Sequence, residues 1–356
     1  LLEGKRIALY SNHTGMVGNQ HTLDLLLEHK LKVTAIFSPE HGFRGNADAG
    51  EQVSNTKDLK TGIPILSLYD GKEKRPSASS MGKFDVLVVD IQDVGLRFYT
   101  YYITMVQLMD ACAIHNKEVI ILDRPNPNGY YVDGPILEKK YKSGVGGLPI
   151  PVVHGMTLGE LAQMCIGENW LPSKKHCKLQ VVTCENYTHQ TLYELPVPPS
   201  PNLPNMLSIY LYPSICLFEG TPLSLGRGTD LPFQVFGHPD LKDKYTFNFT
   251  PRSKAGAKNP PLLNQKCYGV DYSKLPLEKA RQTKLDLNPV IEAYQAMKGD
   301  AKFFKPFFNL LIGVGYVKQM IVDGKSATQI ESMWAEDVKS FRAQRKPYLL
   351  YPDNEL

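Results

Sequence analysis

The feature that most constrains the fold is an alternation of strand-like and helix-like segments in the first half of the chain. The strand-like segments are short and dense in Val and Ile, without a polar face. Strands of this kind are required by a parallel sheet that helices cover on both faces. The pattern therefore predicts an α/β, Rossmann-like amino-terminal domain. Its strands are expected at residues 5–10, 31–37, 63–68, 85–91, 117–122 and 179–183, and its helices at 21–30, 98–115 and 158–167.

The chain is long enough to form a second domain. Its 356 residues exceed what one hydrophobic core usually holds. Residues 196–204 contain five prolines, too many for a helix or a central strand, so the boundary is expected near residue 204. We predict a catalytic domain at 1–204 and a smaller, mixed α+β domain at 205–356 that closes the cleft. Within the second domain we expect a loop-rich run at 212–239 and helices at 289–298, 303–312 and 327–345.

Composition and charge exclude several classes of protein. Forty basic and 36 acidic side chains leave a net charge of +4, too dilute for the basic stripe that nucleic-acid binding needs. No apolar run approaches the roughly 18 residues of a membrane-spanning helix. The six cysteines contain no C-x-x-C pair, so neither a zinc site nor a redox motif is predicted. Cys177 and Cys184 are near enough in sequence to form a local disulfide. The alternative, that both are free thiols, is also compatible with the sequence.

Polar side chains gather directly after four of the predicted strands. In an open parallel sheet, ligands bind outside the carboxyl ends of the strands, so these four loops are expected to share one edge. They contain a Glu, two His, several Asp and three Arg, which is more than turns and helix caps require. The loops are residues 11–15, 38–45, 90–97 and 123–129.

Glu40 is the strongest candidate for a chemical role in these loops. It lies between Pro39 and His41, in a loop where it cannot form a helical i,i+4 pair. The other polar residues have structural alternatives as turn formers or caps. This second group comprises Asp90, Asp123, Ser11 and Asn12.

Two further segments carry an imidazole or paired charges. His154 precedes a stretch in which Thr157 and Glu160 have capping-box spacing, so Glu160 is predicted to cap a helix and His154 is a candidate ligand. In the second domain, Glu219 and Arg227 lie among glycines that permit close backbone approach. Structural turns are the alternative explanation for that cluster.

Several common cofactor and hydrolase motifs are absent from the sequence. Residues 324–326 read GKS, like the end of a phosphate-binding loop, but Gln319 stands where its leading glycine belongs. No G-x-G-x-x-G follows the first strand, and neither G-x-S-x-G nor H-E-x-x-H occurs. We therefore expect no cofactor and no resident metal.

Several segments together resemble the signatures of one known family. They are SPEHGFRG at 38–45, DIQDVGLRFYTY at 90–101, DRPNP at 123–127, HGMT at 154–157, LFEGT at 217–221 and GRGT at 226–229. Through these strings, which span most of the chain, the sequence resembles the NamZ-type exo-β-N-acetylmuramidases. The resemblance implies a Rossmann-like amino-terminal domain, a smaller carboxy-terminal domain and a cleft between them.

The activity that the resemblance implies is removal of N-acetylmuramic acid from the non-reducing end of peptidoglycan fragments. Peptidoglycan-derived sugars are then the expected partners. A periplasmic or secreted location is expected too, with a signal segment removed ahead of Leu1.

Glycosidic cleavage usually needs one carboxylic acid to protonate the leaving oxygen and a second group to stabilise or attack the sugar carbon. Glu40 is the expected acid, and Asp93 or Glu219 the expected second carboxylate. Alternatively, the acetamido group of the substrate attacks, with a carboxylate orienting it. The lactyl carboxylate of muramic acid suits an Arg fork, from Arg44, Arg97 or Arg227. The expected substrate-binding residues are Asn12, His41, Arg44, Arg97, Tyr99, Asn126, His154 and Arg227.

Two other functions are compatible with the same residues. A non-catalytic binder of anionic cell-wall sugars would use the same cleft, and product release from a chromogenic muramide separates it from an enzyme. A metal-dependent hydrolase is the other alternative, and sensitivity to a chelator would identify it. Its ligands would come from His13, Glu40, His41, Asp93 and Asp123.

Overall fold

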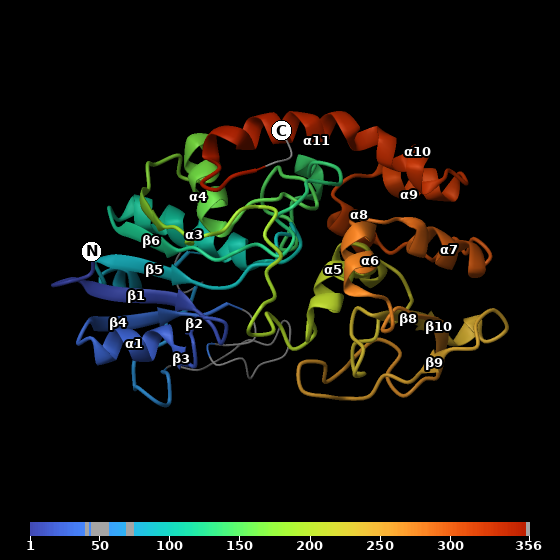
Figure 1. The fold of residues 1–356 in the computed structure, drawn as a ribbon, viewed down its shortest axis with the longest axis horizontal. Helices are drawn as coiled ribbons and strands as arrows, with labels where there is room; N and C mark the ends of the chain where they lie inside the picture. The colour runs from blue at the N-terminus through green and yellow to red at the C-terminus, as the bar shows by residue number, and fades with distance from the viewer. Residues whose placement is uncertain (40–42, 44–56, 69–74, 354–356) are drawn as a thin grey trace.

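The amino-terminal half is built around a parallel sheet. The computed structural model describes residues 1–39, 43, 57–68 and 75–353, and in it five strands pair in the order β4-β1-β5-β6-β7 (Figure 1). Every pairing in this sheet is parallel, which confirms the predicted α/β class. The strands are β1 (Arg6–Ser11), β4 (Lys32–Phe37), β5 (Val86–Asp90), β6 (Glu118–Leu122) and β7 (Lys178–Val182).

Different helices cover the two faces of the sheet. In β5, Val86 and Val88 belong to one apolar cluster with α1, whereas Leu87 and Val89 belong to a larger cluster with α3 and α4. Successive side chains of a strand point to opposite faces, so a strand with no polar face needs this double cover. The helices of this half are α1 (Thr22–Glu28), α2 (Ala78–Met81), α3 (Tyr101–Ile114), α4 (Leu158–Gly167) and the 3₁₀ turn η2 (Lys139–Tyr141).

The strand order places a topological switch point between β1 and β5. From β1 the chain goes to β4 on one side, and it then crosses to β5 on the other side. Doubly wound sheets bind their ligands outside the carboxyl ends of the strands at this point. Ser11 and Asp90, which end the two strands, are register partners there. A short hairpin, β2 (Met16–Val17) and β3 (Gln20–His21), follows β1.

The carboxy-terminal half combines helices with a small antiparallel sheet in the order β8-β10-β9, as the mixed α+β prediction required. Its strands are β8 (Val235–His238), β9 (Asn248–Phe249) and β10 (Cys267–Asp271). Its α-helices are α5 (Met206–Ile215), α6 (Leu277–Thr283), α7 (Asn288–Ala296), α8 (Pro306–Ile312), α9 (Tyr316–Val322), α10 (Ala327–Glu331) and α11 (Ala335–Arg345). Its 3₁₀ turns are η3 (Cys216–Gly220), η4 (Pro239–Leu241), η5 (Ser332–Trp334) and η6 (Lys346–Tyr348).

One local prediction was wrong, and two others were confirmed only in part. Residues 63–68 form only isolated bridges, because Pro64 has no N–H to donate to a ladder. The first residues of the run expected to be loop-rich belong to α5 and η3. Asn205 caps α5, and the burial of every residue of this helix stabilises it although Pro213 lies within it. The helix expected at 327–345 is interrupted by η5.

The end of the chain returns to the amino-terminal half. Figure 1 shows α11 running along one side of the molecule from α10 towards α4. Beyond it, Tyr351 Oη donates a 2.7 Å hydrogen bond to Asp123, and the Leu350 N–H donates one of 2.9 Å to Glu160. The larger apolar cluster also contains residues from both sides of position 204. The boundary near 204 stays a prediction.

All six cysteines lie within the described ranges, and all are free thiols, so the local disulfide between Cys177 and Cys184 is not formed. Cys184 Sγ instead donates to the backbone oxygen of Asp123 at 3.3 Å. None of the helices in the described part of the chain is long and apolar enough to cross a membrane.

Candidate active site

Asp93 is the carboxyl group whose surroundings best suit a catalytic role. It follows β5 by three residues, at the switch point of the sheet. Its Oδ1 accepts a 2.7 Å hydrogen bond from the Gly95 N–H, whereas Oδ2 is buried and has no hydrogen-bond partner among the described residues. Burial raises the pKa of Asp93 to about 7. This carboxyl therefore changes charge near neutral pH, as catalytic acids and bases do.

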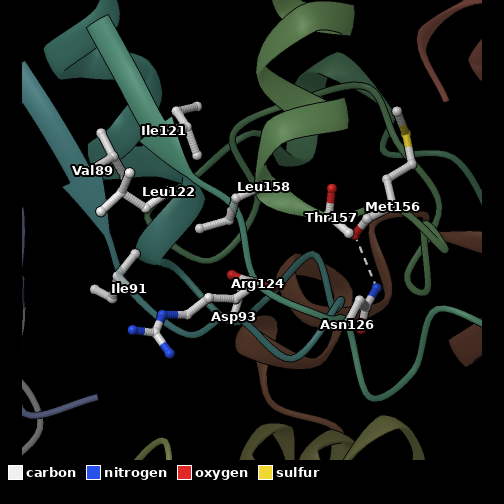
Figure 2. Close-up of a pocket in the computed structure, with 10 residues that line it drawn as sticks. All are labelled: Val89, Ile91, Asp93, Ile121, Leu122, Arg124, Asn126, Met156, Thr157 and Leu158. Carbon is white, nitrogen blue, oxygen red and sulfur yellow. Dashed lines mark hydrogen bonds between the residues drawn. The ribbon is translucent and has the colours of Figure 1, made fainter. Parts of the chain in front are cut away.

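A small cavity adjoins Asp93 at the ends of β5 and β6. Its volume is about 10 Å³, close to the space that one water needs. Figure 2 shows residues of its lining, in which the guanidinium of Arg124 extends away from Thr157 at the start of α4. Asn126 closes the cavity near Met156, to whose backbone oxygen it donates a 2.9 Å hydrogen bond.

Asn12 lies fully buried after β1, on the other side of the switch point. Its Oδ1 accepts hydrogen bonds from the N–H and the hydroxyl of Thr14, at 2.9 and 2.6 Å. Its Nδ2 is buried and has no acceptor in the described part of the chain. An unpaired buried donor is uncommon and points to a water or a ligand as the missing partner, so Asn12 stays a candidate for substrate binding.

Asp90 and Asp123, whose roles the sequence left open, are bound within the protein. Asp90 accepts a 2.6 Å hydrogen bond from Arg124 Nε and another from the Thr22 hydroxyl. Asp123 accepts hydrogen bonds from the Thr157 hydroxyl at 2.6 Å and from Tyr351 Oη at 2.7 Å. Burial raises the pKa of Asp123. Both carboxyls hold neighbouring loops in place.

Arg97 is located in the interior, so the prediction that it binds substrate is not supported by its position. Its exposed fraction is 0%. The guanidinium donates to four backbone oxygens at 2.7–3.0 Å, two from the first half of the chain and two from the end of α8. Burial lowers the pKa of Arg97 to about 10, so the side chain remains charged. Through these hydrogen bonds Arg97 joins the two halves of the protein. The four oxygens belong to Pro135, Ile150, Leu311 and Ile312.

Replacing Arg97 with Met should therefore destabilise the fold. Each buried carbonyl that loses its donor costs about 1–3 kcal/mol, so we expect the free energy of unfolding to fall by at least about 3 kcal/mol. Urea denaturation of Arg97→Met measures the change, with the exposed Arg252→Met as the control. A loss below about 1 kcal/mol together with weaker muramic acid binding would return Arg97 to the binding site.

His154, Tyr99 and Asn126 are also engaged within the protein. Burial lowers the pKa of His154 to about 3, so its ring is neutral, and Nδ1 accepts from the Met156 N–H at 3.2 Å. Tyr99 Oη donates to the Pro199 oxygen at 2.8 Å. Asn126 accepts from the Asn128 N–H at 2.8 Å. These residues position the loops around Asp93. His154 Nε2 is buried and has no hydrogen-bond partner among the described residues, as with Asn12 Nδ2, so His154 stays a candidate ligand.

Glu219 and Arg227 lie together in the second half of the chain. Arg227 Nε and Nη2 donate to Glu219 Oε1 at 2.9 and 2.6 Å, and the pair lines a separate cavity of about 580 Å³. Neither residue lines the small cavity beside Asp93. Of the two expected second carboxylates, only Asp93 therefore stands at the edge of the sheet.

A chain of aromatic contacts runs from Tyr99 to Arg227. Burial raises the pKa of the Tyr99 phenol, with Tyr101 and Asp93 adding to the shift, and the Tyr99 ring lies 6.2 Å from the ring of Tyr212. The Tyr212 ring contacts Phe233 at 4.8 Å, and Arg227 lies 5.0 Å above Phe233. These contacts link the loop after β5 to the Glu219–Arg227 pair through three packed rings.

Three predicted site residues, Glu40, His41 and Arg44, lie outside the described residues. In the ranges that the structure describes, no group of three or more His, Cys, Asp or Glu side chains could hold a metal ion. The residues of the metal-dependent alternative include Glu40 and His41, so that alternative is tested in solution below.

The sequence analysis placed Gln92 and Arg124 in the polar loops but did not name them as site residues, and it missed Lys305. Gln92 Nε2 donates to the backbone oxygens of Asp93 and Pro125, both at 2.8 Å, and so fixes the two loops that surround Asp93. Arg124 is the second residue after β6, inside one of the four polar loops, a position that could have identified it. Lys305 lines the larger cavity from the start of α8, and no sequence signal marks it.

The chain is similar to known proteins over nearly its full length. A curated relative, "Peptidoglycan beta-N-acetylmuramidase NamZ" from Bacillus subtilis (strain 168), is 37% identical over 98% of this chain and 88% of its own length. A crystal structure of a DUF1343 family protein from Bacteroides fragilis NCTC 9343 is 63% identical, with a TM-score of 0.93 over 99% of this chain and 96% of that one. A second DUF1343 structure from the same strain is 30% identical, with a TM-score of 0.78 over 99% and 95% of the two chains.

The family comparison divides the chain into two matched regions. Residues 7–207 match "Exo-beta-N-acetylmuramidase NamZ, N-terminal", and residues 210–351 match the corresponding carboxy-terminal domain. The first region contains the parallel sheet with Asp93, and the second contains the Glu219–Arg227 pair. The chain belongs to the exo-β-N-acetylmuramidase NamZ family.

Proposed function

We propose that this protein is an exo-acting glycosidase that removes N-acetylmuramic acid from the non-reducing end of peptidoglycan fragments, and that Asp93 is its second carboxylate. Membership of the family supports the activity. The observation that carries the role of Asp93 is its position at the switch point of the sheet, as a buried carboxyl with one oxygen that no described residue pairs.

Asp93 acts in its ionised form. Burial makes the charged form of this carboxyl unfavourable in the resting protein, which is why the pKa of Asp93 is raised to about 7. During glycosidic cleavage, positive charge develops on the sugar ring and its acetamido group. A carboxylate beside that charge is stabilised only as the transition state forms, and this differential interaction lowers the barrier.

Glu40 supplies the proton for the leaving oxygen in this scheme. Its assignment comes from its place between Pro39 and His41 in the loop that follows β4. β4 is parallel to β1 and pairs with it, so both strands end at the same edge of the sheet. Two carboxyl groups with separate tasks then meet the general requirement for glycoside hydrolysis.

The test is release of N-acetylmuramic acid from a defined disaccharide and a defined tetrasaccharide with muramic acid at the non-reducing end. An exo-acting enzyme should release one monosaccharide at a time, and mass spectrometry of the remaining oligosaccharide shows whether it shortens stepwise. Binding of the fragments without any release would instead support the non-catalytic binder.

Removal of metal ions by a chelator distinguishes the proposed glycosidase from a metal-dependent hydrolase. We expect full turnover after dialysis against EDTA, because proton transfer and charge stabilisation by two carboxyls need no metal. Loss of turnover in EDTA that Zn²⁺ restores would overturn this expectation and favour the hydrolase built on His13, Glu40, His41, Asp93 and Asp123.

A further inference from the structure

The last described residues of the chain bind the start of α4. We call residues 345–353 the tail segment. Arg345 Nη1 donates a 2.6 Å hydrogen bond to the Gly155 oxygen, just before α4, and the Leu350 N–H donates one of 2.9 Å to Glu160 in the first turn of that helix. Each donor lies 190 residues further along the chain than its acceptor. The tail segment therefore holds the start of α4 from the far end of the sequence.

Tyr351 adds a contact to the loop that follows β6. Its Oη donates a 2.7 Å hydrogen bond to Asp123 Oδ2, which also accepts from the Thr157 hydroxyl at 2.6 Å. Asp123 Oδ1 accepts from the Gly159 N–H at 2.9 Å. The fit is close, since a Cβ at Gly159 would lie 2.8 Å from Asp123 Oδ2. Asp123 thus connects the end of β6 to the start of α4, and Tyr351 fixes the carboxyl that makes this connection.

The connected segments form one wall of the small cavity beside Asp93. Met156 and Thr157 line that cavity at the start of α4, and Asn126 lines it from the loop that begins with Asp123 (Figure 2). Asn126 Nδ2 donates a 2.9 Å hydrogen bond to the Met156 oxygen, which joins the two parts of the wall. A shift of Asp123 would therefore move this wall relative to the carboxyl of Asp93.

The tail segment is itself held in place at Tyr351. The exposed fraction of Tyr351 is only 6%, and its ring packs against the ring of Tyr187 with 4.8 Å between the centroids. The next residue, Pro352, accepts a 3.1 Å hydrogen bond from the His189 N–H. Because ring and backbone are both fixed, the hydroxyl of Tyr351 has little freedom to leave Asp123.

We propose that Tyr351 is a positioning residue for the glycosidase reaction: acting through Asp123, it holds the wall of the cavity in the place that catalysis at Asp93 requires. The inference rests on the proposed function of Asp93. A displacement of about 1 Å in a catalytic site can cost about 10²-fold in rate, so one hydroxyl outside the reacting centre is able to control turnover. An interaction that is complete only in the transition state acts on kcat and leaves KM unchanged.

The first test is the kinetics of Tyr351→Phe, which removes the hydroxyl and keeps the ring. On a nitrophenyl muramide we expect kcat to fall by about 10-fold or more, with KM within about 2-fold of the wild-type value. The matched control is Tyr348→Phe. Tyr348 Oη donates a 2.8 Å hydrogen bond to Glu168 Oε1 at the other end of α4, so this variant loses the same kind of bond away from the cavity wall. It should keep the wild-type kcat.

The second test establishes that Tyr351 acts through Asp123. Asp123→Asn should lower kcat as Tyr351→Phe does, and the double variant should lose no more than Asp123→Asn alone, because both changes remove one interaction. Multiplying losses would show independent action and overturn the proposal. If Tyr351→Phe does not fold, Asp123→Asn carries the same expectation for kcat and KM.

Hydrogen exchange measures the restraint without turnover. Amides of residues 154–160 should exchange faster in Tyr351→Phe than in the wild type or in Tyr348→Phe. An unchanged kcat in folded Tyr351→Phe would overturn the proposal, and so would an equal loss in Tyr348→Phe. A lower kcat without faster exchange would also overturn it, because Tyr351 would then contact the substrate itself. Failure of the proposed function is distinct, since the wild type would then release no muramic acid.

Discussion

Replacing Asp93 with Asn should reduce turnover of muramides by at least about 10²-fold, on substrates with poor and good leaving groups alike. The side chain keeps its shape, and its oxygen can still accept the hydrogen bond from Gly95. What is lost is the negative charge beside the developing cation. Because that charge forms with every leaving group, improving the leaving group should not rescue the variant.

The pH dependence of kcat/KM tests the same assignment. Since Asp93 acts as a carboxylate and burial raises its pKa to about 7, kcat/KM of the wild type should rise as pH increases through about 7. The Asn variant should lack this rise. Asp85→Asn is the matched control, because Asp85 precedes the same strand at the opposite edge of the sheet. A wild-type kcat/KM that instead falls through pH 7 would make Asp93 the acid.

Stability should respond to pH with a defined sign. The pKa of Asp93 lies above its unfolded value, so between about pH 4 and pH 7 the folded protein binds the additional proton. Ionisation in this window lowers the free energy of unfolding as pH rises. Relative to wild type, Asp93→Asn should therefore gain more than about 1 kcal/mol on going from pH 5 to pH 8 in urea denaturation. His154 has the opposite sign but is present in both proteins, so its contribution cancels.

The sheet could be predicted because its determinants are local. Val86 to Val89 form a short apolar run, which a strand buried on both faces requires, and the structure places alternate side chains of that run in two different clusters. The edge of the sheet where polar loops meet follows from the parallel direction of the strands alone.

The site could be predicted only in part, because burial and pairing are long-range properties. Arg97 is of a residue type that often binds anionic ligands. However, two of its four hydrogen-bond acceptors, Leu311 and Ile312, lie more than 200 residues further along the chain. The sequence around Lys305 contains no motif that marks it as a site residue. The contact between η3 and α8 brings it close to Glu219. No spacing rule reports either arrangement.

Replacing Glu40 with Gln should give a different pattern from Asp93→Asn. Gln keeps the shape of the side chain but cannot donate a proton to the leaving oxygen. Turnover on natural fragments should fall by at least about 10²-fold, in line with general acid catalysis. On a dinitrophenyl muramide, whose leaving oxygen needs little protonation, the loss should shrink markedly.

The comparison of the two variants on the two substrates assigns the roles. Glu28→Gln, at the end of α1, is the control for the substitution itself. If Glu40→Gln loses activity equally on both substrates, Glu40 positions the substrate or attacks it, and the acid must be sought elsewhere. A folded Glu40→Gln protein with near-normal turnover would remove Glu40 from the mechanism. The same measurement on Glu219→Gln would then decide whether the carboxyl paired with Arg227 reaches the reacting bond.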